Sequence, residues 1–254
     1  MELAVKTFHR QAQIACSQCS LLELCLPKGL TKEELEYFEQ AVNPKKPLKK
    51  YEFLYRAGEE MTSLYTVKTG AFKANIDSAD GQENIVGFFL PGELIGLDGI
   101  ASGQYQCDII ALGDAYVCQL SYHEFQRISN QLPVLREEIL SISSENLTTA
   151  QKMLFYIGKR PVEERLAMFL IGLSQRYGAR GLSNLRFQLS MSRHDIANYL
   201  GMAPETISRQ FKKMQDQGLI LIDNREITII DLPKLQAAST SRTLSQIDTS
   251  KLKR

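Results

Sequence analysis

The stretch LSMSRHDIANYLGMAPETISRQFKKMQDQGLILI, residues 189–222, decides the fold of the C-terminal part of this chain. Ser192 and Asp195 resemble a capping box in which Asp replaces the usual Glu, and they predict a helix start. Residues 201–203 predict a short turn, and Pro204 suits the first position of the next helix, where its missing N–H costs nothing. Two helices joined in this way form a helix-turn-helix. The apolar residues expected on their inner faces are Ile196, Ala197, Leu200, Ile207, Phe211 and Met214.

The outer face of the second helix carries side chains suited to DNA. Glu205, Ser208 and Arg209 lie at positions i, i+3 and i+4, so they project together from its N-terminal half. That half meets base edges in the major groove, where Arg donates twice to guanine and Glu accepts from cytosine. Lys212 and Lys213 follow and suit phosphate contacts. We predict a recognition helix, with a solvated surface helix as the alternative.

The charge of the chain is segregated. The 254 residues carry a net charge of +1, but from residue 160 onward 15 Lys and Arg stand against 9 Asp and Glu. The C-terminal part is therefore +6 and the preceding part −5. A basic region is typical of nucleic-acid binding, although a solvated surface has the same composition. Residues 219–230, broken at Asp223 and Asn224, predict the hairpin of a winged helix-turn-helix.

Residues 51–121 consist of short apolar runs separated by turn residues. The runs are FLYRAG, SLYTVKTG, AFKANIDSADG, QENIVGFFLPG, ELIGLDG and DAYVCQLS. Regular short strands with Gly-containing turns predict an all-β barrel or roll. Asp80 and Gly81 suit a hairpin turn, because glycine reaches positive φ at little cost.

Residues 135–157 contain neither Gly nor Pro and predict one long helix, which Gly158 and Pro161 end. Two apolar stripes run along it. One stripe consists of Ile139, Ile142 and Met153. The other consists of Leu140, Leu147, Ala150, Leu154 and Ile157. One stripe can pack on its own domain and the second on another copy of the chain. A dimer interface is therefore favoured over burial of both stripes within a single chain.

Length and composition limit the class of protein. A chain of 254 residues suggests two modest domains. No secretory signal and no stretch of membrane-spanning length are visible, so we expect a cytoplasmic protein with reduced thiols. The three histidines, His9, His123 and His194, lack a metal-ligand or nucleophile-base spacing to any Cys, so we expect no enzyme. From Ala238 the polar tail is expected to be disordered.

Three cysteines near the start, Cys16, Cys19 and Cys25, form a C-x2-C-x5-C run. Thiolates select zinc, Cu(I) and iron–sulfur clusters. The uneven spacing is closer to iron–sulfur ligation than to the paired ligands of structural zinc. Zinc remains a competitor, and buried or redox-active thiols are the third interpretation. A fourth thiol would have to come from Cys107 or Cys118, far downstream.

The order of cysteine arm, β-roll, long helix and recognition helix resembles the FNR/CRP family of bacterial transcription regulators, specifically its oxygen-responsive FNR (fumarate and nitrate reduction regulator) branch. The resemblance covers residues 14 to about 232 and is carried by CSQCSLLELCLP, GFFLPGELIG, VEERLA and HDIANYLGMAPETISR. It implies an α+β fold in which a cyclic-nucleotide-binding-like jelly roll precedes a dimerisation helix and a winged helix-turn-helix. The expected boundaries are 1–28 for the arm, 29–132 for the β-roll, 133–158 for the dimerisation helix, 159–232 for the DNA-binding domain and 233–254 for the disordered tail.

The resemblance also implies a cofactor and partners. In the FNR branch, three N-terminal cysteines and one β-roll cysteine hold an oxygen-labile [4Fe-4S] cluster, and Cys118 aligns with the fourth ligand. Cys107 is then a small buried residue. The resemblance further implies a homodimer that binds a DNA palindrome resembling TTGAT-N4-ATCAA, responds to oxygen or nitric oxide, and contacts RNA polymerase near residues 78–87. The alternative is a family member controlled by zinc or thiol redox chemistry.

Two features of this sequence differ from the motifs of related Crp/Fnr regulators. The cyclic-nucleotide branch follows its Gly-Glu-Leu turn with an Arg-Ser/Thr pair that binds the cyclic phosphate, but here those positions hold Tyr105 and Gln106. Without that arginine the phosphate lacks its main partner, so cyclic nucleotide binding is not expected. In the helix, Ala150 places no charge in the expected dimer interface, so we expect the cluster-free protein to dimerise more readily than a relative with a charged interface.

Overall fold

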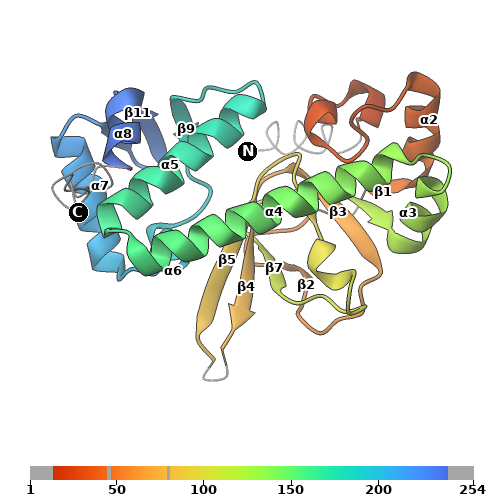
Figure 1. Ribbon diagram of the computed structural model, residues 1–254, viewed down its shortest axis with the longest axis horizontal. Coiled ribbons are helices and arrows are strands. Elements are labelled where there is room, and N and C mark those ends of the chain that lie inside the picture. The colour runs from red at the N-terminus through yellow and green to blue at the C-terminus, as the bar shows by residue number, and fades with distance from the viewer. Residues whose placement is uncertain (1–13, 45–46, 79–80, 240–254) are drawn as a thin grey trace, which may run out of the picture. The chain divides into compact units, whose positions relative to one another are not determined.

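The computed structural model describes residues 14–44, 47–78 and 81–239. They form two compact units divided between Thr149 and Ala150, and Figure 1 labels the elements of each. Within the described residues, no helix is both long and apolar enough to cross a membrane.

The arm at the start of the first unit folds into two short 3-10 helices, η1 (Cys16–Gln18) and η2 (Leu22–Leu24), followed by helix α2 (Lys32–Ala41). Thr31 and Glu34 form a reciprocal capping box that starts α2. Leu35 and Phe38 are buried on the inner face of this helix. The arm is thereby continuous with an element that packs on the roll.

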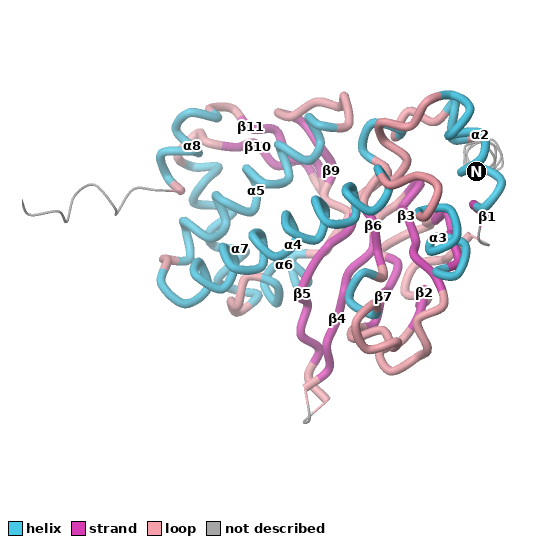
Figure 2. The backbone as a smooth tube through the Cα atoms, turned by 45° about the vertical axis from the view of Figure 1, so that its right-hand side comes forward, coloured by secondary structure: helices cyan, strands magenta, loops and turns pink. Residues whose placement is uncertain are grey.

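Eight strands form two four-stranded antiparallel sheets in the first unit (Figure 2). One sheet has the order β1 (Val42–Pro44), β8 (Tyr116–Ser121), β3 (Ser63–Thr69) and β6 (Leu94–Ile95). The other has the order β2 (Phe53–Tyr55), β7 (Asp108–Ala111), β4 (Phe72–Asp77) and β5 (Glu83–Phe89). The predicted β-roll is confirmed. Asp80 lies outside the described residues, whereas Gly81 has the positive φ of 77° expected in the turn between β4 and β5.

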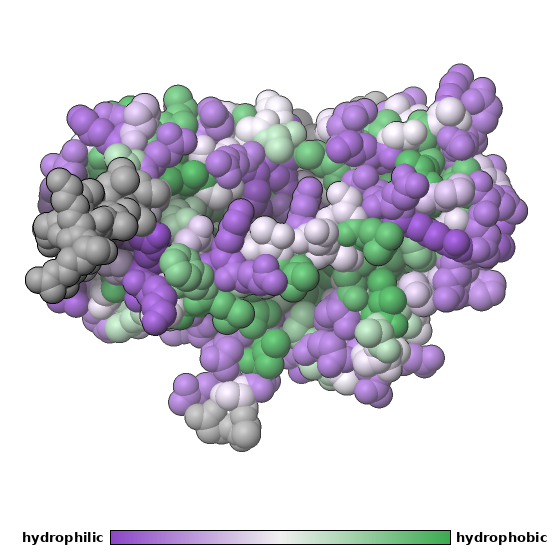
Figure 3. Space-filling view, in the orientation of Figure 1, coloured by the Kyte–Doolittle hydropathy of each residue, from purple (hydrophilic) through white to green (hydrophobic). Residues whose placement is uncertain are grey.

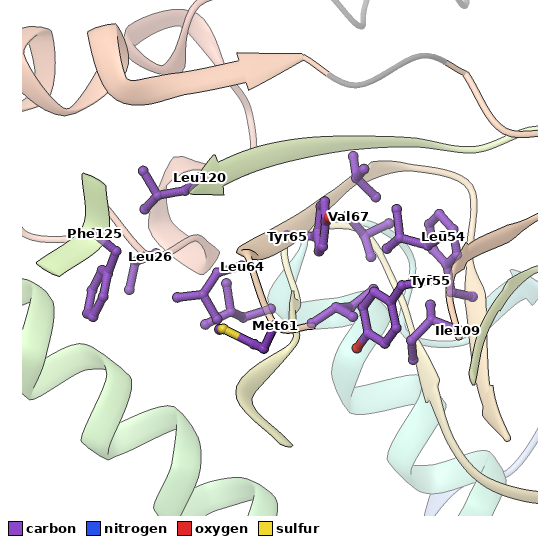
Figure 4. Packing of buried hydrophobic residues seen from close by; sticks show 14 of the residues in the cluster. Leu26, Leu54, Tyr55, Met61, Leu64, Tyr65, Val67, Ile109, Leu120 and Phe125 are labelled. Atoms are coloured by element: carbon purple, nitrogen blue, oxygen red, sulfur yellow. The ribbon is translucent and has the colours of Figure 1, made fainter. Parts of the chain in front are cut away.

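The space between the sheets holds the core of the roll. Val67 and Ile109, from opposite sheets, have no exposed surface, and Figure 4 shows them with the neighbouring side chains of β2 and β3. Leu26 of the arm, Leu64, Leu120 and Phe125 lie together on the other side of the first sheet (Figure 4). The sheet that contains β3 and β8 is therefore covered on both faces. The roll is completed by η3 (Leu97–Gly99) and α3 (Tyr122–Ser129).

Helix α4 (Val134–Lys159) is the long helix expected from the sequence. Its first half packs on the roll, because Leu135 is fully buried and Ile139 and Ile142 pack against the core. Met153, the third member of that stripe, is half-buried. The other stripe remains exposed in the single chain.

The second unit contains α5 (Val162–Ala179), β9 (Arg186–Gln188), α6 (Arg193–Tyr199), α7 (Pro204–Asp216), β10 (Ile220–Asp223), β11 (Glu226–Ile229) and α8 (Leu232–Ala238). The predicted capping box of Ser192 and Asp195 is present, and Pro204 is the first residue of α7. The predicted hairpin pairs β10 with β11, and β9 completes a three-stranded sheet. Asn224 in its turn has a φ of 53°.

The domain end expected at residue 232 is too early. Residues 232–238 form α8, which Asp231 caps by accepting a hydrogen bond from the backbone N–H of Lys234 at 2.9 Å. Leu235 is fully buried and fixes this helix on the second unit. The apolar residues of this segment, LPKLQAA, were the signal that the helix continues the domain. The remaining expected tail, residues 240–254, lies outside the described residues.

Candidate metal centre and nucleic-acid interface

Four of the five cysteines line one cavity of about 40 Å³ between the arm and the roll. Cys16, Cys19 and Cys25 come from the arm, and Cys118 comes from β8. The apolar side chains that line the rest of this cavity are Ile14, Leu21, Leu22, Leu26, Pro27, Phe38, Val42, Leu64, Val67, Leu94 and Leu120. The structure thus brings together residues that are about a hundred positions apart in the sequence.

The floor of the cavity is one face of the sheet that contains β3 and β8. Side chains of a strand alternate between its faces, so Leu64, Thr66 and Lys68 of β3 share one face. Thr66 lies directly opposite Cys118 of β8 in the antiparallel register. The same register pairs Leu64 with Leu120. The sheet therefore fixes the position of Cys118 independently of the arm.

The arm is held over this floor by specific contacts. Within the arm, backbone N–H groups of Cys19 and Cys25 close the two 3-10 turns by donating to the carbonyls of Cys16 and Leu22, at 3.0 and 3.2 Å. The Sγ of Cys25 lies 3.5 Å from the Oγ1 of Thr66. The two local turns thus satisfy backbone groups of the arm without using the thiols.

Two residues of the roll approach the arm closely. The Nζ of Lys68 donates to the backbone carbonyl of Ile14 at 2.6 Å. Gly92, with a φ of 89°, is the point where the roll backbone comes nearest to Leu24: an added Cβ would lie 2.9 Å from the Cβ of Leu24. Neither residue was singled out for this role by the sequence, because the contact partner is far away in the chain.

Burial is the main influence on the cavity thiols. The pKa of Cys16 is raised to about 11, chiefly by desolvation and then by the neighbouring Cys118, whereas Lys68 acts in the opposite sense. Desolvation likewise raises the pKa of Cys25 to about 12, against the hydrogen bond to Thr66. The pKa of Cys118 is raised by desolvation and lowered in part by Lys68. The raised pKa values of Cys16, Cys25 and Cys118 favour neutral thiols without a bound cation, and a metal would have to displace their protons.

A donor set of four sulfurs suits a soft metal centre, either zinc or an iron–sulfur cluster. As the described residues stand, no group of three or more His, Cys, Asp or Glu side chains could hold a metal ion. The fifth cysteine is elsewhere: Cys107 is buried in the roll, and its Sγ donates to the Oδ2 of Asp98 at 3.3 Å.

The positions that the cyclic-nucleotide branch uses for phosphate binding have other partners here. Tyr105 is buried, stacks on Tyr55 with ring centroids 3.6 Å apart, and donates from its hydroxyl to the carbonyl of Ser63 at 2.7 Å. The backbone N–H of Gln106 donates to a carboxylate, the Oδ2 of Asp98, at 2.9 Å. Neither side chain supplies a cation, and the neighbouring carboxylate would repel a phosphate.

Glu93 has an architectural contact in the same loop, where its Oε2 accepts a hydrogen bond from the backbone N–H of Leu90 at 2.9 Å. The Gly-Glu-Leu turn therefore has an observed structural role.

The second unit presents the predicted recognition helix, α7. Its inner residues, Ile207, Phe211 and Met214, are buried as expected. Among its outer residues Glu205, Ser208, Arg209 and Lys212 are exposed. Ser208 donates to the carbonyl of Pro204 at 3.0 Å, which leaves its oxygen able to accept.

Lys213 differs from the expectation of a simple phosphate ligand. Its ammonium forms an ion pair with the carboxylate of Glu163 on α5. A DNA phosphate would have to compete with this internal partner. Lys212, the neighbouring lysine of α7, is also exposed. The ion pair with Glu163 is formed by Lys213.

Arg193, the first residue of α6, packs against the inner face of α7. Its guanidinium lies 3.4 Å over the ring centroid of Phe211, and desolvation lowers its pKa to about 10. Its Nη1 is buried and has no hydrogen-bond partner among the described residues. The side chain therefore connects α6 to α7, and its buried end is not presented to solvent.

The exposed stripe of α4 is the candidate dimer interface. Leu140, Leu147 and Leu154 are 69%, 60% and 74% exposed, and Ile157 is 41% exposed. Ala150 is exposed in the same stripe. Hydrophobic surface is visible on the face of the molecule that carries α4 (Figure 3). Such a continuous apolar stripe is typical of a helix that packs against a partner.

Comparison with known protein families matches both units. Residues 164–238 match the Crp-like helix-turn-helix domain, and residues 45–131 match the cyclic nucleotide-binding domain. The first match extends through α8, in agreement with the corrected domain end. The fold and the helix-turn-helix define a DNA-binding transcription regulator with an N-terminal β-roll domain.

Curated relatives cover most of the chain. The transcriptional activator protein Anr of Pseudomonas aeruginosa is 40% identical over 225 residues, which are 89% of this chain and 92% of that protein. The fumarate and nitrate reduction regulatory protein of Salmonella typhimurium is 37% identical and covers 88% of this chain and 90% of that protein. The chain belongs to the FNR branch of the Crp/Fnr family of transcription regulators. The expectation of a transcription regulator and not an enzyme is confirmed.

Solved structures agree with this assignment. FixK2 from Bradyrhizobium japonicum is 25% identical, has a TM-score of 0.71, and covers 78% of this chain and 96% of that chain. A CooA mutant from Carboxydothermus hydrogenoformans, at 19% identity and a TM-score of 0.66, covers 86% of this chain and 95% of that chain and supports the fold. The α+β architecture expected from the sequence is confirmed.

Proposed function

We propose that this protein is an oxygen-responsive global regulator of anaerobic metabolism in which Cys16, Cys19, Cys25 and Cys118 hold a [4Fe-4S] cluster. The observation that carries the proposal is the shared cavity of these four thiols. Relatives named for anaerobic control, such as the anaerobic regulatory protein of Haemophilus influenzae at 38% identity, add support. When bound, the cluster would supply iron–sulfur bonds that oxygen or nitric oxide attacks.

The chain's own residues supply the connection between sensing and DNA binding. Ligation from both the arm and β8 would fix the arm on the sheet, and that sheet also packs against α3 and the first half of α4. Loss of ligation would release the arm from Cys118 and remove this constraint. The helix that carries the exposed apolar stripe begins on the same core, so the position of its first half depends on the arm.

The DNA-binding state is proposed to be a homodimer. Leu140, Leu147, Ala150, Leu154 and Ile157 would form its interface along α4. Two copies of α7 would then read the halves of a palindrome resembling TTGAT-N4-ATCAA. A single copy binds one half-site and lacks the gain in affinity that comes from binding both half-sites at once.

At each half-site, Glu205, Ser208 and Arg209 are proposed to contact bases. Lys212 and, after release from Glu163, Lys213 would contact phosphates. Residues 78–87, of which 79 and 80 lie outside the described residues, are proposed to contact RNA polymerase. Cyclic nucleotide is not proposed as a ligand, because the positions of the phosphate-binding pair provide no cation.

Metal and sulfide analysis tests the proposal. Protein purified without oxygen is compared with the variants Cys118→Ala and Cys107→Ala. Wild type and Cys107→Ala are expected to contain iron and acid-labile sulfide and to absorb broadly in the visible range, whereas Cys118→Ala loses both. Equal loss in the two variants would contradict the assignment of the fourth ligand.

A zinc-containing regulator is the second candidate, because its ligands would be the same four sulfurs. The same measurement separates the two functions. Colourless wild-type protein that contains zinc and no sulfide would replace the oxygen-sensor proposal with a constitutive or thiol-controlled regulator.

A further inference from the structure

Lys68 is the charged side chain in an otherwise apolar and thiol-lined cavity. Apart from the four cysteines, the described residues that line the cavity are apolar except for Thr66 and Lys68. Lys68 lies on β3, on the strand face that also presents Thr66 toward the arm.

The ammonium of Lys68 also fastens the arm. It donates to the backbone carbonyl of Ile14, two residues before Cys16, at 2.6 Å. A charge-assisted hydrogen bond of this kind is stronger than a neutral one. It attaches the start of the arm to the sheet that holds Cys118.

The place of the Lys68 charge supports the same role. Lys68 lines the same cavity as Cys16 of the arm and Cys118 of β8. Glu39 does not line this cavity. Four thiolates in a desolvated cavity repel one another, so a single cation among them stabilises the ligated state.

We propose that Lys68 is a positioning residue of the thiolate site: it anchors the arm through Ile14 and offsets the negative charge that the four cysteines bring to the cavity. The ligand part of this inference rests on the proposed function, whereas the arm-anchoring part concerns the protein alone. Removing the cation would loosen the arm and would leave the sulfur ligands more electron-rich and more easily oxidised.

Three variants separate these effects. Lys68→Met removes the charge and keeps the chain length, Lys68→Arg keeps a cation, and Lys28→Met removes an exposed lysine of the arm that does not line the cavity. The first measurement is hydrogen exchange of the amides of residues 14–28 in the metal-free full-length chain. Exchange on the order of fivefold faster in Lys68→Met, with Lys68→Arg and Lys28→Met close to wild type, is expected.

The second measurement is the rate at which visible absorption decays when anaerobically prepared protein meets air-saturated buffer. We expect decay on the order of fivefold faster in Lys68→Met than in wild type, with Lys68→Arg restoring most of the difference. Circular dichroism melting shows that each variant is folded.

Unchanged exchange and decay in folded Lys68→Met would overturn the inference. Faster decay in Lys28→Met as well would show a general effect of lysine loss and would also overturn it. If no variant, wild type included, contains a chromophore, the proposed cluster fails, but the exchange measurement still decides whether Lys68 anchors the arm.

Discussion

At the scale of single residues, burial determines the state of the cavity thiols. Cys25 is the clearest case, because desolvation raises its pKa to about 12 in spite of a hydrogen bond to Thr66. Such a thiol stays protonated at neutral pH and is a poor nucleophile in the metal-free protein. A bound cation would reverse the preference by favouring the thiolate. Binding of a metal by the cysteines of the arm would therefore release protons.

Gly92→Ala is expected to destabilise the protein and to displace the arm. The residue has a φ of 89°, and the new Cβ would lie 2.9 Å from the Cβ of Leu24. Gly58→Ala is the matched control, because Gly58 has a φ of 84° and nothing within 4 Å of an added Cβ. Backbone strain of about 1–3 kcal/mol is common to both variants.

Urea unfolding should therefore show a larger loss of unfolding free energy for Gly92→Ala than for Gly58→Ala. Equal losses would mean that the contact between Gly92 and the arm is absent in solution.

At the scale of elements, α7 combines three tasks on one short helix. Its inner residues pack on α6, its N-terminal outer residues face solvent, and Lys213 binds Glu163 of α5. Pro204 at its first position and Gly201 in the preceding turn set where the helix begins. Arg165 supports that turn by donating to the carbonyl of Leu200. The local hydrogen bonds thus determine which side chains the helix can offer to DNA.

Substitution of Arg209, Lys212 and Lys213 by Gln should distinguish base contacts from phosphate contacts. Arg209→Gln is expected to cost about 1–3 kcal/mol on the palindrome and to relax base preference. Lys212→Gln should weaken binding to all sequences and reduce the salt slope by about 1. Lys213→Gln should have a smaller effect, because its ion pair with Glu163 must be broken before it can contact a phosphate.

Affinity titrations at several salt concentrations, on the palindrome and on an unrelated duplex, provide the comparison. A loss confined to the palindrome in Lys212→Gln would contradict its assignment to a phosphate.

At the scale of the whole molecule, α4 is the element that would connect the proposed sensing site to the proposed dimer interface. Its N-terminal half belongs to the core of the roll, where Leu135 is fully buried. Its exposed stripe continues beyond the division between the two units, with Leu154 74% exposed. An apolar stripe without a charge favours association even when the arm is released. This is the physical basis of the expectation that the cluster-free protein dimerises readily.

Ala150→Asp should therefore turn the cluster-free protein into a monomer. A buried carboxylate facing its own copy would be repelled and desolvated in the interface. Gln151→Asp, exposed and outside the stripe, is the control. Size-exclusion chromatography with light scattering, before and after exposure to air, measures the outcome. An unaltered chain that becomes fully monomeric in air would contradict the prediction.

Local patterns in the sequence were sufficient to predict the helix-turn-helix, the β-roll and the long helix. Capping residues, turn glycines and apolar periodicity act over a few positions, so they are visible without a structure. The spacing of Cys16, Cys19 and Cys25 likewise indicated a soft metal centre. The choice between Cys107 and Cys118 could not be made from spacing, because it depends on which strand face meets the arm.

The tertiary structure separates the surroundings of these two cysteines and adds contacts that spacing does not show. Antiparallel register places Cys118 beside Thr66 under the arm, while Cys107 is buried near Asp98. The same packing brings Lys68 to the arm and Lys213 to Glu163, and it buries Leu235 of α8 beyond the expected domain end. These contacts join residues far apart in the chain, and their energies depend on distance and burial. The sequence by itself determined the elements and the kinds of chemistry they carry, whereas only the fold determined which of those groups meet.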